Sequence, residues 1–406
     1  MARDVARPAP SPPQPLAHPA PGELRVGLLA YALARSRGGI GRYTAELCRA
    51  LPRLGVEVHV LQAGRSGLAD ATALPGAGRL PGLLTVGQVE IARAVRRHRL
   101  ALVHDPTGVA PLLLVRGARR VATVHDVIPY VLPETSTTLD RWVYRYWLPR
   151  VVRALDAVIT VSRHSKADIQ RFLRVDPARV HVVPEGVHPR YRPVAREAAL
   201  ATLARYGIRA PYILFVGSVE ERKNLPRLLE AYAALRAWST RWTLVVVGAR
   251  QWRSSPAFET VRRLGLGPHV RFTGFVPEDD LPALYAGADL FVFPSLYEGF
   301  GLPVLEAMAC GTPVVASNAA SLPEVAGDAA LLVDPRAVDA LGAAMRRVLT
   351  DEGLARALRA RGLERARAFT WDRAARLTLA VYQEVLHGVV EPGAGLPAAG
   401  RRPRRP

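Results

Sequence analysis

Short apolar runs alternate with amphipathic, helix-like segments along most of the chain. In the first half, the runs that predict strands are Leu24–Ala30, Val56–Leu61, Leu100–His104, Val121–Val124 and Ala157–Val161. Strands that alternate with helices are typical of parallel βαβ units, in which helices cover both faces of one sheet. The first half therefore predicts an α/β domain.

The second half repeats this alternation. Its predicted strands are Tyr212–Val216, Trp242–Val247, Val270–Thr273, Leu290–Phe293, Pro313–Ala316 and Ala330–Val333. Between the halves, residues 184–211 carry several prolines, which predicts a hinge. A chain of 406 residues is too long for one ordinary domain. The predicted fold class is α/β, with two Rossmann-like domains.

The pattern also predicts where the domains end. Residues 1–22 are rich in proline and lack the apolar segment of a signal peptide, so we expect a disordered leader. Residues 23–188 and 189–370 are the two expected domains, 371–388 a last amphipathic helix, and 389–406 a disordered basic tail. No apolar run approaches the roughly 18–20 residues that span a bilayer.

The charge and composition of the chain limit the classes of partner that it is expected to bind. The net charge of +20 favours phosphate-bearing partners such as nucleotides or anionic lipids. Nucleic-acid binding is not expected, because the sequence has no zinc-finger spacing, basic heptad helix or aromatic RNA-binding motif. Cys48 and Cys310 lie far apart, and neither clusters with histidines, so no disulfide and no zinc site is expected. This cysteine usage fits a reducing cytoplasm.

The most informative stretch follows the predicted strand 290–293 and reads PSLYEGFGLPVLEAMACGTP from Pro294 to Pro313. Pro303 suits the first turn of a helix, and Gly311 suits its end. Backbone N–H groups at the start of that helix would bind phosphate. They belong to Phe300, Gly301 and Leu302.

Glycines and carboxylates complete this predicted site. Gly299 and Gly301 leave room for a ligand to approach the backbone. Glu298 lies in the loop and Glu306 lies on the helix, where a carboxylate can accept hydrogen bonds from ribose hydroxyls. The stretch thus predicts a nucleotide diphosphate held by the backbone and sugar hydroxyls held by carboxylates.

Glu298 and Glu306 have the spacing E-x7-E, and the segments around them, PSLYEGFGLP and EAMACGTPVVAS, resemble glycosyltransferase family 4, which has the GT-B fold. Two surface glutamates at this spacing are the alternative, but the longer match is specific. The resemblance covers about residues 24–386. It implies two Rossmann-like domains that face each other across a cleft, with the last helix crossing back to the first domain.

A second match to the family is FVGSVEERKNL, residues 215–225. A strand is followed by Gly217, a donor-binding candidate, and by a basic pair before a helix that we expect Asn224 to cap. In similar enzymes, basic residues here neutralise the departing diphosphate, which implies this role for Arg222 and Lys223. Many members carry arginine directly after the glycine, and Ser218 stands there in this chain. Lys223 is therefore the stronger candidate, and a solvated basic loop is the alternative.

Two motifs in the first half complete the resemblance. GGIGRY, from Gly38 to Tyr43, resembles the loop that lies against the donor diphosphate and the acceptor, so Gly38 and Gly39 are donor-binding candidates. A plain tight turn is the alternative. His125, in HDVIP, follows another strand, and in similar enzymes a histidine here contacts the donor sugar. Its alternative role is to satisfy local backbone, and Asp126 is expected to order the loop.

Three further segments have weaker signals. FTGFVP, residues 272–277, resembles backbone that flanks the nucleotide base. Asp279 and Asp280 do not form the D-x-D metal motif, so we expect no obligatory metal and no cofactor, and we expect the pair to be a solvated first turn of a helix. Leu139–Leu148 is aromatic and basic at helical spacing. It suits an anionic membrane surface, but core packing of its aromatic face is the preferred prediction.

The resemblance implies a retaining, metal-independent glycosyltransferase whose catalytic residues are Lys223, Arg222, His125 and Glu298. The mannosyltransferase-like motifs HD-x-IP and E-x-RKN favour GDP-mannose as the donor, with a UDP-sugar second. The expected acceptor is a glycan, a glycolipid or a small molecule, and the expected location is the cytoplasm or the inner face of the membrane. Alternatives are a nucleotide-sugar epimerase and a non-catalytic sugar-nucleotide-binding protein.

Overall fold

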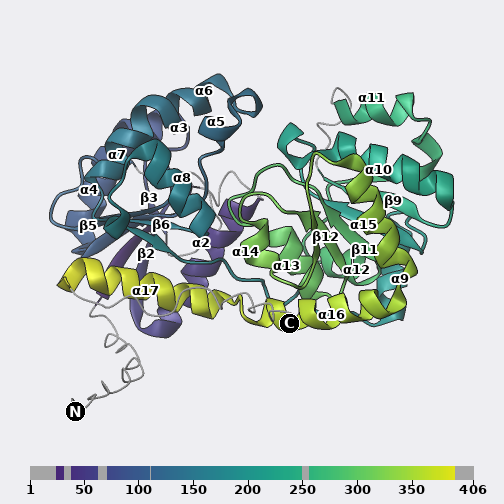
Figure 1. Cartoon of the computed structure of the whole chain (residues 1–406). Coiled ribbons are helices and arrows are strands. Elements are labelled where there is room, and N and C mark those ends of the chain that lie inside the picture. The colour runs from purple at the N-terminus through teal and green to yellow at the C-terminus, as the bar shows by residue number, and fades with distance from the viewer. Residues whose placement is uncertain (1–23, 32–37, 63–70, 110, 249–255, 389–406) are drawn as a thin grey trace, which may run out of the picture.

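The computed structural model describes residues 24–31, 38–62, 71–109, 111–248 and 256–388. The predicted leader and the predicted basic tail lie outside these residues. Two parallel sheets lie side by side, each with helices on both faces (Figure 1). The prediction of a two-sheet α/β fold is therefore confirmed.

The first sheet has seven strands in the order β3-β2-β1-β4-β5-β6-β7. They are β1 (Leu24–Leu29), β2 (Val56–Gln62), β3 (Thr72–Ala73), β4 (Leu102–Asp105), β5 (Arg119–Thr123), β6 (Ala157–Thr160) and β7 (Val180–Val182). The second sheet has six strands in the order β10-β9-β8-β11-β12-β13. They are β8 (Tyr212–Val216), β9 (Thr243–Val247), β10 (Val270–Gly274), β11 (Leu290–Phe293), β12 (Val314–Ser317) and β13 (Leu331–Val333).

Helices connect these strands. Around the first sheet they are α2 (Gly39–Ala50), η1 (Pro52–Leu54), α3 (Leu80–Leu84), α4 (Val86–His98), α5 (Ile128–Val131), η2 (Pro133–Thr135), α6 (Thr138–Trp142), η3 (Val143–Trp147), α7 (Leu148–Ala154), α8 (Arg163–Leu173) and η4 (Pro177–Arg179). Later in the chain they are α9 (Arg196–Arg205), η5 (Glu221–Lys223), α10 (Leu225–Trp238), α11 (Pro256–Arg263), η7 (Gly267–His269), α12 (Leu281–Ala286), α13 (Leu302–Ala309), α14 (Leu322–Ala326), α15 (Val338–Thr350), α16 (Glu352–Arg367) and α17 (Trp371–His387).

All eleven apolar runs that predicted strands form strands, and no end is shifted by more than two residues. The pattern missed β3 and β7, which have two and three residues. Each pairs with one neighbour, β3 with β2 and β7 with β6, at an edge of the first sheet. Strands this short at a sheet edge do not need a continuous apolar run, so hydrophobic patterning does not detect them.

Each face of the first sheet covers its own hydrophobic core. Consecutive residues of β1 alternate between the faces, so Leu28 lies in one core and Leu29 in the other. The last helix, α17, packs in the core that holds Leu28, where Ala375 and Leu379 meet α2. The helix therefore crosses back to the first sheet, as the family resemblance implied. Figure 1 shows α16 below the second sheet and α17 below the first.

Buried hydrogen bonds hold α17 in this position. The ring of His104 on β4 bonds to the hydroxyl of Tyr382 through Nδ1 (2.7 Å) and to the hydroxyl of Thr123 through Nε2 (2.8 Å). The Thr123 hydroxyl also bonds to the hydroxyl of Tyr43 on α2 (3.0 Å). Burial lowers the pKa of His104 to about 3, so the imidazole is neutral. These bonds connect α2, β4, β5 and α17.

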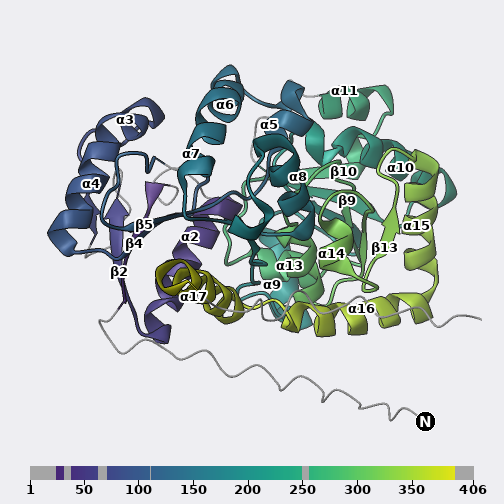
Figure 2. The same ribbon diagram turned by 60° about the vertical axis from the view of Figure 1, so that its left-hand side comes forward.

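The two sheets approach each other at the loops that follow β5 and β11. A Cβ atom built on Gly299 would lie 2.5 Å from the carbonyl oxygen of His125. The hydroxyl of Ser165 lies 3.0 Å from that oxygen and 3.2 Å from the carbonyl oxygen of Gly299. At the start of α8, the backbone N–H groups of Arg163 and His164 donate to Glu324 on α14 (3.0 and 2.7 Å), and Figure 2 shows α8 on the side of the first sheet that faces α14. Loops at the carboxyl ends of parallel strands are the usual ligand-binding region of such folds.

Candidate functional site

The loop and helix after β11 form as predicted. Helix α13 begins at Leu302 with Pro303 in its first turn, and Gly311 follows its end with a φ of +76°. Gly301 precedes the helix with a φ of +112°, which is unfavourable for residues other than glycine. Protein atoms fill the space beside the loop glycines, since a Cβ atom on Gly301 would lie 2.5 Å from Leu322. The prediction that Gly299 and Gly301 leave room for a ligand is therefore corrected, because neighbouring protein atoms take the space where their side chains would lie.

A buried charge cluster surrounds Glu298. Its carboxylate accepts hydrogen bonds from Lys223 Nζ (2.6 Å), from Arg222 (3.0 Å) and from the hydroxyl of Ser295 (2.6 Å). A Cβ atom built on Gly217, which directly follows β8, would lie 3.7 Å from the Lys223 side chain. Three of the four predicted catalytic residues therefore meet at one point.

The Glu298 cluster places two cations beside the N-terminus of α13. Lys223 and Arg222 both pair with Glu298, and Arg222 also pairs with Glu220 (2.8 Å), so the carboxylates hold the cations in place and balance their charge. Burial alone would raise the pKa of Glu298, but Lys223 and Arg222 outweigh burial and lower it. The carboxylate is ionised at neutral pH, and the cluster suits an anionic group such as a diphosphate.

The loop after β8 differs from the prediction in one detail. Glu220 accepts hydrogen bonds from Ser218 (2.6 Å) and from Arg222 (2.8 Å), so Ser218 indirectly supports the Arg222 guanidinium. Asn224 does not cap α10 through its side chain. Its amide instead donates to the carbonyl oxygens of Pro294 (3.0 Å) and Pro335 (2.7 Å), because the residue adopts a left-handed conformation. Asn224 therefore links the β8 loop to the β11 loop.

Glu306, the second glutamate of the motif, has different partners. Its carboxylate bonds to the hydroxyl of Tyr285 (2.8 Å) and forms an ion pair with Arg42 on α2. Arg42 also bonds to Glu278 (3.0 Å), which in turn pairs with Arg190 (3.3 Å). The guanidinium of Arg42 therefore reaches from the first sheet to carboxylates of the second.

Sequence reasoning missed Arg42, although it quoted the motif GGIGRY that contains it. A basic residue directly after a glycine loop is a weak signal. The partner Glu306 is 264 positions away in the chain. The carboxylates raise the pKa of Arg42 although burial opposes them, so the guanidinium is charged.

The predicted donor-binding backbone brings two helix N-termini together. Gly39 begins α2, and a Cβ atom on it would lie 3.8 Å from Leu302, the first residue of α13. The side chains of Phe300 and Leu302 are buried, so these residues present only backbone to a ligand. Gly38, just before α2, is exposed. Two helix N-termini this close together favour an anion bound near both.

His125 is the fourth predicted catalytic residue, and it lies apart from the Glu298 cluster. Its Nε2 bonds to the carbonyl oxygen of Pro106 (2.9 Å) and its Nδ1 to Glu185 (3.2 Å). Burial opposes protonation, but the bond and charge of Glu185 outweigh burial and raise the pKa of His125. Both ring nitrogens thus have protein partners, which favours the structural role over contact with the sugar. The ring also packs edge-on against Tyr43 of GGIGRY (4.8 Å).

The prediction of a solvated acidic pair before α12 is right for Asp279, whose side chain is 90% exposed, and wrong for Asp280, whose side chain is 15% exposed. Asp279 forms an ion pair with Arg190 (2.9 Å). Asp280 forms an ion pair with Arg205 (2.7 Å) and accepts a hydrogen bond from Tyr206. Within the described ranges, no three His, Cys, Asp or Glu side chains gather closely enough to hold a metal ion.

The aromatic and basic stretch 139–148 is divided between core and surface. The Trp147 indole donates to the carbonyl oxygen of Val109 (2.8 Å), and Tyr144 packs against Tyr130. Trp142 and Tyr146 are 49% and 46% exposed. The prediction of core packing is therefore right for half of the aromatic residues and wrong for the other half. None of the helices in the part of the chain that the structure describes is long and apolar enough to cross a membrane.

Comparison with known families divides the chain at the same place as the two sheets. Residues 37–191 match the family described as Glycosyltransferase Family 4, and residues 206–365 match the family described as Glycosyl transferases group 1. The first match ends after β7 and the second begins before β8.

Individual relatives agree with these matches. The chain is 37% identical to the Escherichia coli O-antigen chain mannosyltransferase B over 72% of its own length and 76% of that protein. It is 32% identical to an MMP alpha-(1->4)-mannosyltransferase of Mycolicibacterium hassiacum over 89% and 98% of the two chains. Among solved structures, sucrose-phosphate synthase from Thermosynechococcus elongatus has a TM-score of 0.73 at 24% identity, over 90% of this chain and all of that one. An Anabaena protein in complex with UDP and glucose has a TM-score of 0.69 at 18% identity, over 89% and 100%.

Proposed function

The chain belongs to glycosyltransferase family 4, has the GT-B fold and is a nucleotide-sugar-dependent glycosyltransferase, and on this basis we propose that it transfers mannose from GDP-mannose to a glycan with retention of anomeric configuration. The observation that carries the proposal is the convergence of Lys223 and Arg222 on Glu298 beside the N-terminus of α13. That arrangement matches the negative charge that develops when a sugar leaves a nucleotide diphosphate.

In the proposed reaction, the bond between the anomeric carbon and the β-phosphate oxygen breaks, and the acceptor hydroxyl oxygen bonds to that carbon. The hydroxyl proton passes to the departing phosphate. Lys223, Arg222 and the backbone N–H groups near Gly301 stabilise the charge on the β-phosphate. Glu298 is a positioning residue, because it holds both cations before the donor arrives.

The choice of mannose rests on the relatives. The two named above are both mannosyltransferases, at 37% and 32% identity. The structure that contains UDP and glucose is 18% identical, so a UDP-sugar is the second choice. In either donor, Glu306 is proposed to accept hydrogen bonds from the ribose hydroxyls. We further propose that turnover needs no divalent metal and no cofactor, because two cations and a helix N-terminus supply the positive charge.

Calorimetry without metal tests the donor. We expect GDP-mannose to bind the wild type in EDTA, and Glu306→Ala to weaken binding about tenfold through loss of charge-assisted hydrogen bonds. Binding of UDP-glucose in place of GDP-mannose would overturn the choice of mannose. Unchanged affinity in Glu306→Ala would overturn the ribose assignment. NMR of the glycoside product gives the anomeric configuration, and an inverted product would contradict retention.

The acceptor is proposed to be a glycan or glycolipid presented at the inner face of a membrane. Trp142 and Tyr146 are exposed beside Arg141 and Arg145 on one continuous helical stretch. Aromatic and basic side chains together favour the interface of an anionic bilayer. Sedimentation with phosphatidylglycerol vesicles should retain the wild type and lose the Trp142→Ser/Tyr146→Ser variant, and equal sedimentation of the two would contradict membrane contact.

A further inference from the structure

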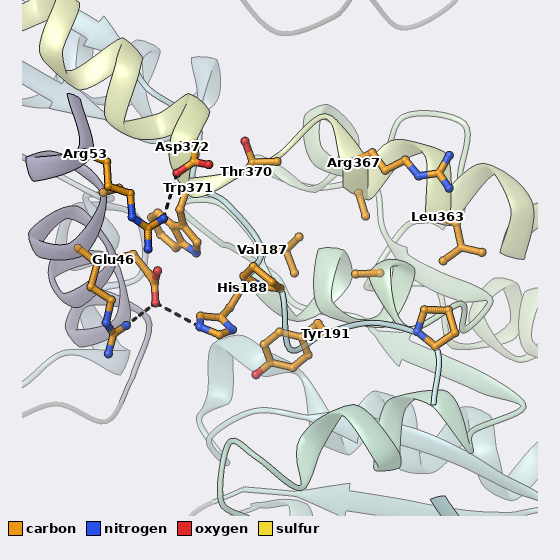
Figure 3. Close-up of a pocket in the computed structure, with 16 residues that line it drawn as sticks. Glu46, Arg53, Val187, His188, Tyr191, Leu363, Arg367, Thr370, Trp371 and Asp372 are labelled. Atoms are coloured by element: carbon orange, nitrogen blue, oxygen red, sulfur yellow. Dashed lines mark hydrogen bonds and ion pairs between the residues drawn. The ribbon is translucent and has the colours of Figure 1, made fainter. Parts of the chain in front are cut away.

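A cavity of about 540 Å³, separate from the Glu298 cluster, lies between the two segments that connect the sheets (Figure 3). Val187, His188 and Tyr191 line it from the segment after β7, and Thr370 and Trp371 line it from the junction of α16 and α17. We call it the hinge cavity. It contains none of the hydrogen-bond or ion-pair partners of Glu298 or Glu306, and its volume is typical of small-molecule sites.

The charged groups of the hinge cavity are paired with one another. Glu46 bonds to Arg49 (2.7 Å) and lies 3.8 Å from His188, and Arg53 lies 3.6 Å from Asp372 (Figure 3). The third arginine of the lining pairs with a carboxylate outside it, Arg367 with Glu364 (2.9 Å). The cavity therefore presents donors and acceptors side by side without excess charge. Sugar hydroxyls, which both donate and accept, suit such a lining better than a phosphate does.

Part of the hinge-cavity lining is apolar and aromatic, and two of its residues carry a buried polar group without a partner among the described residues, the Trp371 indole N–H and the Tyr191 hydroxyl. Val187, Leu363 and Ala366 line the cavity together with the rings of Tyr191 and Trp371. Trp371 is 5% exposed, yet its indole N–H has no hydrogen-bond partner among the described residues. Buried polar groups are nearly always paired, so these two groups are candidates for hydrogen bonds to a ligand hydroxyl in the cavity.

We propose that the hinge cavity binds one or two units of a neutral glycan, with a sugar ring against Trp371 and Tyr191 and a hydroxyl on the indole N–H. For a glycosyltransferase, the glycan is a part of its acceptor or product distant from the reacting end. That source rests on the proposed function, whereas the chemistry of the cavity does not.

The position of the hinge cavity connects it to the donor site. Tyr191 lines the cavity, and its ring also lies 5.7 Å from the Arg42 guanidinium and 5.9 Å from the ring of Tyr285, which are the two partners of Glu306. Because both connecting segments line the cavity, its shape changes when the sheets move relative to each other. A bound saccharide therefore favours one arrangement of the sheets, and donor and saccharide change each other's affinity reciprocally.

Calorimetry on the full chain without nucleotide tests the site, with methyl α-D-mannopyranoside, α-mannobiose and inorganic phosphate as probes. We expect the saccharides to bind and phosphate not to bind. Trp371→Phe keeps the ring and removes the unpaired N–H, so it should weaken saccharide binding about fivefold. Leu363 is half-buried in the lining, so the larger side chain of Leu363→Trp should fill part of the cavity and abolish binding. Trp238→Phe, on the distant helix α10, is the matched control.

Three results would overturn the proposal. These are no saccharide binding to the wild type, phosphate binding in place of saccharide, and saccharide binding that persists in both Trp371→Phe and Leu363→Trp. Because no donor is present, failure here does not bear on the proposed reaction. Circular dichroism and nucleotide binding show that each variant is folded. If saturating saccharide leaves the affinity of the wild type for nucleotide unchanged, that result would contradict the proposed coupling.

Discussion

The two glutamates of the E-x7-E motif have different partners. Glu298 is neutralised from within its own half of the molecule, by Lys223 and Arg222 on the loop after β8. Glu306 is neutralised from the other half, by Arg42 on α2. The first cluster does not depend on how the two sheets are arranged, whereas the second exists only when they are close together. One motif thus joins a glutamate to cations of its own half and a second glutamate to a cation of the other half.

The largest expected effect comes from removing a cation of the Glu298 cluster. Lys223→Ala should lower turnover about 10²–10³-fold, because one preorganised donor in such a site stabilises the transition state by roughly 3 kcal/mol. Donor affinity should fall much less. Lys166, the only other lysine in the chain, supplies the matched control Lys166→Ala. An equal loss of affinity with turnover intact would contradict the assigned role.

A smaller effect is expected from breaking the pair between the two halves. Arg42→Ala leaves Glu306 buried without its countercharge and should cost about 2 kcal/mol of donor binding, roughly thirtyfold in Kd. The control is Arg190→Ala, whose partner Asp279 is largely exposed. In the double variant Arg42→Ala/Glu306→Ala, the losses should be smaller than the sum of the single losses. Additive losses would mean that the pair does not couple donor binding to closure.

A substitution that adds bulk without changing charge can test how the distance between the two halves affects activity. Gly299→Ala places a methyl group against the backbone carbonyl of His125, which belongs to the other half of the molecule. We expect the halves to be held apart and kcat/KM to fall about tenfold, equivalent to an overpacking cost of about 1–2 kcal/mol. Gly267→Ala, where a Cβ atom meets nothing within 4 Å, is the control. Small-angle scattering that shows unchanged compaction in Gly299→Ala would contradict this explanation.

The smallest expected effect is on stability at low pH. The cations lower the pKa of Glu298 below its ordinary value of 4.5, so its contribution to stability is complete above 4.5 and is lost as the pH falls through the lowered pKa. Glu298→Gln removes that titration. Denaturant unfolding between pH 7 and pH 3 should show the wild type approaching the variant on acidification. Parallel pH profiles would contradict an ionised, paired Glu298.

Much of the fold follows from local patterns in the sequence. Apolar runs such as Leu290–Phe293 become central strands because a sheet covered on both faces needs side chains that are apolar throughout. Pro303 and Gly311 mark the two ends of α13 because each favours a backbone geometry that the helix needs there. The match to the family therefore located the β8 and β11 loops correctly from short segments.

The sequence did not show which groups would occupy the same space. From the sequence, Asn224 was a plausible helix cap, but in the structure its side chain donates to the carbonyl oxygens of Pro294 and Pro335. From the sequence, His125 was a plausible contact to the donor sugar, but in the structure both of its ring nitrogens bond to protein groups, one of them Glu185. Each alternative was consistent with the local sequence, and only the neighbours brought in by the fold decided between them.

By itself, the sequence determined the two α/β halves, the position of the loops proposed to meet the donor and the residue types in those loops, because strand burial, helix ends and glycine geometry depend on a few consecutive residues. Only the tertiary structure decided that Arg42 pairs with Glu306 and that two distant connecting segments enclose the hinge cavity. Those features depend on how the two halves are placed, and that placement results from contacts between residues hundreds of positions apart.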